Sequence, residues 1–272
     1  MQKRIDCHTH IVNAEIKDEY FLRTDGYAIV MQFLPKFRKI VEDDSYNTVK
    51  SDRRLFLCPC IDISKDIPPQ LDAIEQRLAD SRIVGLKIYL TYQTGRADDE
   101  RLWCVYEFAR KHRLSVTFHN GLCSLVLPTD NDMVGSNAQY VANAAERFPE
   151  VNFIIAHMDD PRFDECIRLV HAHKNLFTDF SGAYEPGTKE DADIEWAIDT
   201  FGKAIHQYPD TYKQILFGTD FCPPINLSAL LEYDYSIGKI FTPEQFEDVY
   251  FNNCLRAFPR LLEYLRESEK ER

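Results

Sequence analysis

Near its start the chain reads Ile5-Asp6-Cys7-His8-Thr9-His10, a short apolar run that ends in two histidines two positions apart. Side chains at i and i+2 of a β-strand point to the same face, so this stretch predicts a first strand that projects both imidazoles together. Two adjacent imidazoles are typical of transition-metal sites. Because a single His-x-His pair is a weak signal, its meaning depends on the rest of the chain.

The composition limits the classes of protein to consider. The chain has 272 residues and a formal net charge of −12, which suits one α/β domain over residues 1–272. Lys and Arg are scattered, and no run approaches the roughly 20 apolar residues of a membrane span. We therefore expect a small-molecule substrate and neither a nucleic-acid nor a membrane partner, while a homo-oligomer stays open.

The eight cysteines are spread over mostly apolar segments, which predicts reduced, buried thiols and a cytoplasmic location. Cys58-Pro59-Cys60 has the spacing of a chelating pair, but no second cysteine pair accompanies it. We therefore interpret the cysteines as structural.

Apolar runs alternate with helical patterns along the chain, which favours βα units around a parallel sheet. Eight such runs in a chain of this length predict a distorted (β/α)8 TIM barrel with its active site at the C-terminal ends of the strands. The predicted strands are Arg4–His8, Tyr27–Phe33, Arg54–Ile61, Ile83–Leu90, Ser115–His119, Asn152–His157, Asn175–Asp179 and Gln214–Thr219.

Chemically active side chains follow several of these strands. His8 and His10 follow the first, His119 ends the fifth, His157 ends the sixth and Asp220 follows the eighth. A lone histidine there is usually structural, and Gly218-Thr219-Asp220 alone could be a helix cap. In a barrel, however, these ends converge on one mouth, where imidazoles and a carboxylate suit Zn²⁺ or another divalent first-row metal.

The chain also resembles the amidohydrolase superfamily, in particular the amidohydrolase-related branch that contains aminocarboxymuconate-semialdehyde decarboxylase. The matching elements run through nearly the whole chain in the family's order. They are Asp6-Cys7-His8-Thr9-His10, Val84-Gly85-Leu86-Lys87, Phe118-His119, Ile155-Ala156-His157-Met158, Phe217-Gly218-Thr219-Asp220 and Asn253-Cys254-Leu255-Arg256-Ala257-Phe258.

The resemblance implies that His8, His10, His119 and Asp220 hold one divalent metal, which we expect to be Zn²⁺. It implies that His157 contacts the substrate or the catalytic water. Lys87 matches the position where binuclear members carry a carboxylated lysine, so a second metal stays an alternative. Asp159-Asp160-Pro161 departs from the glycines that often follow the sixth-strand histidine in this family.

The expected activity is hydrolysis of an amide, ester or lactone bond by a metal-activated water, with Asp220 as general base and His157 as the second catalytic residue. We expect Asp6 to orient an imidazole. The alternatives are non-oxidative decarboxylation of an unsaturated or aromatic acid, and a barrel without catalysis. Lys87, Arg96 and Arg162 are candidate carboxylate anchors, and Tyr89, Tyr92 and Tyr184 are candidate mouth residues; of these, Lys87, Tyr89 and Arg162 are our predicted substrate-binding set.

Overall fold

The computed structural model describes residues 3–39, 42–121, 135–182, 191–221 and 230–270. Within these ranges it contains eight parallel strands, each close to a predicted one. They are β1 (Ile5–Thr9), β2 (Tyr27–Met31), β3 (Leu55–Cys58), β4 (Gly85–Tyr89), β5 (Ser115–His119), β6 (Phe153–Ile155), β7 (Leu176–Asp179) and β8 (Ile215–Leu216).

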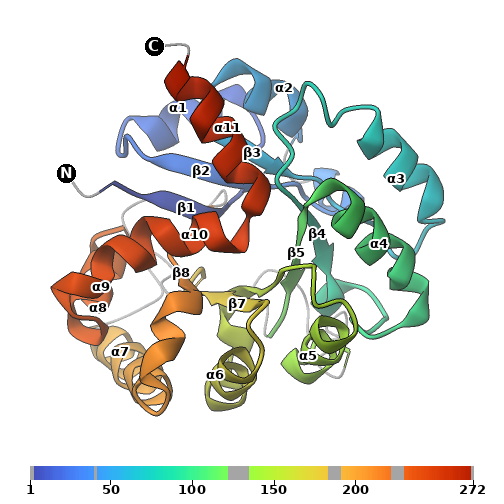
Figure 1. Cartoon of the computed structure of the whole chain (residues 1–272). Helices are drawn as coiled ribbons and strands as arrows, with labels where there is room; N and C mark the ends of the chain where they lie inside the picture. The colour runs from blue at the N-terminus through green and yellow to red at the C-terminus, as the bar shows by residue number, and fades with distance from the viewer. Residues whose placement is uncertain (1–2, 40–41, 122–134, 183–190, 222–229, 271–272) are drawn as a thin grey trace.

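Among the described residues one α-helix follows each strand, and these helices surround the strands; three more follow α8, of which the last two lie across one end (Figure 1). The α-helices are α1 (Ala14–Phe21), α2 (Ser45–Ser51), α3 (Pro68–Glu75), α4 (Trp103–His112), α5 (Ala138–Arg147), α6 (Phe163–Ala172), α7 (Asp191–His206), α8 (Leu230–Ile240), α9 (Pro243–Glu247), α10 (Asn253–Ala257) and α11 (Pro259–Lys270). A π-helical turn, η8 (Asp248–Asn252), joins α9 to α10. None of the helices in the described ranges is long and apolar enough to cross a membrane.

The strands form a distorted (β/α)8 barrel, as the sequence predicts. Their ladders make two sheets, in the orders β1-β2-β3 and β4-β5-β6-β7-β8. Isolated bridges join the sheets at both seams, between Leu57 and Ile83 on one side and between Thr9 and Phe221 on the other. The barrel therefore closes through short contacts at the seams rather than through continuous ladders.

Five of the strands, β2, β3, β4, β6 and β8, end earlier than predicted, and for β3 and β6 the reason is local. Pro59 has no backbone N–H to donate, so the ladder of β3 stops at Cys58. After β6 the chain turns through Ala156–Asp159, where His157, Met158 and Asp159 all have φ near +50° to +60°. His157 therefore lies on a left-handed turn after the strand, not on the strand itself.

The N-terminal end of the barrel is closed by α10 and α11. Phe258 and Leu261 pack with Ile5 and other inward-facing strand residues in one buried cluster. The hydroxyl of Ser115 at the start of β5 donates to the carbonyl of Ala257. Since this end is packed, the strand ends at the opposite face are the ones available for chemistry.

Candidate metal and catalytic site

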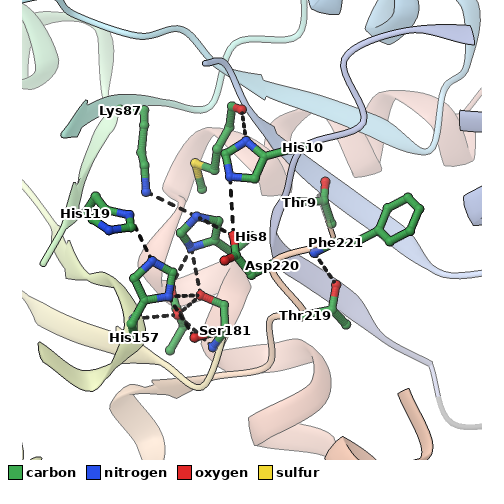
Figure 2. Close-up of polar contacts among 12 residues, drawn as sticks. His8, Thr9, His10, Lys87, His119, His157, Ser181, Thr219, Asp220 and Phe221 are labelled. Carbon is green, nitrogen blue, oxygen red and sulfur yellow. Dashed lines mark hydrogen bonds and ion pairs between the residues drawn. The ribbon is translucent and has the colours of Figure 1, made fainter. Parts of the chain in front are cut away.

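The seam between β1 and β8 brings the histidine pair to the predicted carboxylate. The backbone N–H of Asp220 donates to the carbonyl of His8 at 2.9 Å. Asp220 Oδ1 then lies 3.3 Å from His10 Nε2 and 3.6 Å from His8 Nε2. Figure 2 shows these side chains pointing toward one another. Three of the residues predicted to bind metal therefore meet at one point.

The other predicted histidines join the same cluster from β5 and from the turn after β6. His157 Nε2 lies 3.1 Å from His119 Nδ1, and the rings of His8 and His157 are 5.0 Å apart between centroids. Lys87 Nζ, from β4, lies 3.2 Å from His8 Nε2 (Figure 2). Every predicted metal or catalytic residue thus contacts another member of the cluster.

The hydrogen-bond partners define which ring nitrogens carry protons. A carbonyl oxygen only accepts, so His10 Nδ1 donates to Met31 O at 2.8 Å and His157 Nδ1 donates to Ser181 O at 2.7 Å. His157 Nε2 is then unprotonated and accepts a hydrogen bond from the Nδ1–H of His119. His119 Nε2 is left bare, buried and without a hydrogen-bond partner among the described residues.

These assignments fit a divalent metal. In His10 and His119 the Nδ1–H is used by the protein and the Nε2 lone pair is left for a ligand bond. His8 Nδ1 likewise faces a carboxylate oxygen of Asp179 at 3.3 Å, and its Nε2 lone pair faces Lys87 Nζ. One donor atom each from His8, His157 and Asp220 lie within 4.8 Å of one another. Imidazole nitrogens with a carboxylate are the donor set of Zn²⁺ and related ions.

Burial controls the charges in the cluster. It lowers the pKa of His8 to about 4, with Lys87 acting in the same direction, so His8 is neutral near pH 7. Burial also lowers the pKa of Lys87 to about 8. For Asp220, burial favours the neutral acid, but the contact with His10 and the neighbouring imidazoles outweigh it and hold the pKa well below its usual range. The site therefore offers a neutral imidazole beside an ionised carboxylate.

Aromatic side chains surround the imidazoles. The ring of Phe33 stacks on His10 with centroids 4.3 Å apart, and the ring of Tyr92 lies 4.8 Å from that of His119. Tyr89 is also beside His119, but its hydroxyl donates to the carbonyl of Gln32 at 2.9 Å. Tyr184 lies outside the described residues.

The predicted arginine anchors are directed away from the imidazoles. Arg162 forms a bidentate ion pair with Asp159 and also donates to the carbonyl of Ser136. Arg96 pairs with Asp98 and lies over the ring of Tyr140. Lys87 is thus the one predicted cationic anchor that the described structure places inside the cluster.

Sequence reasoning missed two residues of the site, Asp179 and Ser181. Asp179 ends β7, so the rule that selected the other strand ends could have found it. Ser181 Oγ lies 3.0 Å from both His8 Nδ1 and His157 Nδ1. Gly182 follows with φ +73°, where an added Cβ would lie 3.1 Å from His157 Nδ1. A side chain there would therefore press on the cluster.

Asp6 is close to the site but does not orient an imidazole as expected. It accepts hydrogen bonds from the backbone N–H of His8 and from the backbone and hydroxyl of Thr219, and its second oxygen also accepts from Tyr20. Burial raises its pKa to about 7. Asp6 therefore connects the backbone of β1 to the segment after β8, which brings His8 and Asp220 together.

Comparison with known proteins gives one family match. A family model described as Amidohydrolase matches residues 5–260. A comparison with curated proteins finds no match.

Several solved structures have the same fold. An amidohydrolase from Burkholderia multivorans with bound zinc is 13% identical, with a TM-score of 0.65 over 94% of this chain and 99% of that chain. A probable 2-pyrone-4,6-dicarboxylic acid hydrolase from Acinetobacter baumannii is 14% identical, with a TM-score of 0.64 over 95% and 100% of the two chains. A 2,6-dihydroxybenzoate decarboxylase from Rhizobium is 15% identical, with a TM-score of 0.61 over 95% and 99%. At these identities the likeness shows the fold.

Proposed function

Because this chain belongs to the amidohydrolase family, we propose that it is a metal-dependent hydrolase that cleaves an amide, ester or lactone bond of a small molecule. The family predicted from the sequence motifs is confirmed, and with it an enzymatic role. The observation that carries the hydrolase proposal is the position of the Asp220 carboxylate, whose Oδ1 lies 3.3 Å from His10 Nε2 and 3.6 Å from His8 Nε2.

We assign the metal to His8, His10, His119 and Asp220, and expect one Zn²⁺. The Nε2 of His119 has no hydrogen-bond partner among the described residues, which supports this assignment, because a buried imidazole nitrogen without a partner costs free energy unless a ligand occupies it. When bound, a divalent ion supplies Lewis acidity, which lowers the pKa of a water molecule toward neutrality. A second ion beside a carboxylated Lys87 is the alternative, since the Nζ of Lys87 lies 3.2 Å from His8.

Asp220 and His157 carry the proton transfers in this proposal. The low pKa of Asp220 keeps it unprotonated near pH 7, which is the form in which a carboxylate can accept a proton from the attacking water. His157 has its Nδ1–H held by Ser181 O, so its Nε2 is the atom that takes up a proton released by the attacking water and, once protonated, passes it to the leaving group.

Metal removal and reconstitution test the proposal. The protein is stripped with a chelator, reloaded with Zn²⁺, and assayed on panels of amides, esters and lactones, with metal content measured by elemental analysis. We expect activity only in the reloaded protein, and a loss of metal and activity in His119→Ala. His173→Ala is the matched control, because His173 contacts Leu169 and Glu146 on α6 and α5.

Two results would contradict the hydrolase proposal. Full activity in His119→Ala, or a wild-type protein that binds no metal, removes the metal site from the mechanism. Release of CO₂ from unsaturated or aromatic acids without consumption of water instead identifies the alternative, a decarboxylase. Measuring CO₂ and water stoichiometry on the same preparation separates the two reactions.

A further inference from the structure

We propose that Asp179 and Ser181 are positioning residues that together fix the ring orientation and the Nδ1–H tautomer of both His8 and His157. The inference rests on the proposed function only for the roles of these two imidazoles. Its physical basis is a set of buried contacts at the end of β7, where Asp179 is inaccessible to solvent and Ser181 is almost so.

The hydroxyl of Ser181 uses its full hydrogen-bonding capacity within the site. It has one proton, which it donates to Asp179 Oδ1. Its two lone pairs face His8 Nδ1 and His157 Nδ1, each 3.0 Å away. A hydroxyl has one donor and two acceptor positions, so every position is filled. One oxygen atom therefore connects the two imidazoles.

The two oxygens of Asp179 have different tasks. Oδ1 accepts from the backbone N–H groups of His157 and Ser181 at 3.1 and 3.0 Å, as well as from the Ser181 hydroxyl. Oδ2 faces His8 Nδ1 at 3.3 Å. Asp179 thus holds the left-handed turn that carries His157 and, through its other oxygen, the ring of His8.

These contacts determine where the reactive lone pairs are. A carboxylate and a carbonyl can only accept, so both rings must carry their proton on Nδ1. The Nε2 lone pair of His8 is then available to a metal, and that of His157 to proton transfer. Because the Ser181 hydroxyl contacts both rings, its removal should alter the orientation and tautomer of both His8 and His157. Replacement of the Asp179 oxygen that faces His8 should instead alter mainly the tautomer of His8.

Asp179→Asn gives the sharpest test. The two backbone N–H groups require an oxygen, so the amide of the variant keeps its oxygen on them and turns its NH₂ toward His8 Nδ1. His8 must then accept at Nδ1 and carry its proton on Nε2, the atom that should bind metal. We expect two-bond ¹H–¹⁵N correlation spectra of the metal-free protein to show this change of tautomer, and the Kd for Zn²⁺ to rise about 10- to 100-fold.

Asp6→Asn is the matched control. Asp6 is also buried and also bonds to His8, but to its backbone N–H rather than its ring. This variant should lose thermal stability while its folded molecules keep the Nδ1–H tautomer of His8. A purely structural role of Asp179 predicts instead that both variants behave alike.

The inference is overturned if Asp179→Asn folds, keeps the Nδ1–H tautomer of His8 and binds Zn²⁺ with wild-type affinity. If Asp179→Asn does not fold, Ser181→Ala decides, since it should alter the imidazole signals of both His8 and His157, and unchanged signals in both overturn the inference. The spectra need no substrate and no metal. A wild type that binds no Zn²⁺ therefore contradicts the proposed function and leaves the tautomer experiment to decide the roles of Asp179 and Ser181.

Discussion

Replacement of Arg162 by Met separates two interpretations of this side chain. The sequence suggests that Arg162 anchors a substrate carboxylate, whereas the structure shows its guanidinium bound to Asp159. Arg162 Nε lies 2.8 Å from Asp159 Oδ2 and Nη2 lies 2.9 Å from Oδ1, with a third hydrogen bond from Nη2 to Ser136 O at 2.7 Å. We predict that Arg162→Met lowers stability.

The size of the effect follows from burial. The side chain of Asp159 is inaccessible to solvent, while that of Arg162 is 24% exposed. Removing one partner of a buried ion pair costs about 3–5 kcal/mol, and the partial exposure of Arg162 places this case near the lower limit, about 3 kcal/mol. For a chain of this size that corresponds to a fall in Tm of roughly 6–10 °C.

The loss should also depend on pH. Burial raises the pKa of Asp159 even with Arg162 present, and removal of the guanidinium should raise it further. A carboxyl whose pKa is higher in the folded than in the unfolded state destabilises the protein as pH rises through that interval. The stability difference between variant and wild type should therefore be larger at about pH 7 than at about pH 5.

Urea and thermal unfolding followed by circular dichroism measure this difference. Arg96→Met is the matched control, because Arg96 is 53% exposed and pairs with Asp98 on the same loop, so its loss should cost below about 1 kcal/mol. An unchanged Tm in Arg162→Met, combined with a tenfold or larger rise in KM for an anionic substrate, would refute the structural argument and support the role of a substrate anchor.

Three further predictions concern the site itself. Tyr89→Phe should leave KM within about threefold, because the hydroxyl is bound to Gln32 O; a tenfold rise in KM would show that it binds substrate. Gly182→Ala should lower kcat tenfold or more and cost about 1–3 kcal/mol, since the Cβ meets His157 and Asp220 and φ is +73°; wild-type kinetics would contradict this. Asp220→Asn should lower kcat about 10²- to 10⁴-fold even with metal bound, as measured by assay and elemental analysis, and retained activity would assign the general base elsewhere.

The fold is predictable from sequence because its signal is local. Each strand is buried, and each predicted run overlaps an observed strand. The helix α9 begins with a capping box between Thr242 and Gln245, which is also a local signal in the sequence. Strand ends were harder to place, because Pro59 and the left-handed turn at His157 interrupt ladders that hydrophobicity alone would continue.

Residues of the site could be predicted from the sequence only where a chemically active side chain ends or directly follows a predicted strand. His8, His119 and Asp220 have that signal, and the barrel brings them together. The partner of Arg162 was not identified from sequence, although the i, i+3 spacing to Asp159 was available. The role of Ser181 depends on contacts with residues 24 and 173 positions away, which no local pattern records.

The hydrogen bonds of Asp6, which connect β1 to the segment after β8, affect the order in which the site is assembled during synthesis. Its partner Thr219 lies 213 positions further along the chain, so the histidine pair leaves the ribosome long before the carboxylate that completes the site. Until the last strand docks against the first, the imidazoles have no Asp220 and only a partial set of donors for an ion. Metal loading should therefore follow ring closure, which would make a filled site a marker of a finished barrel.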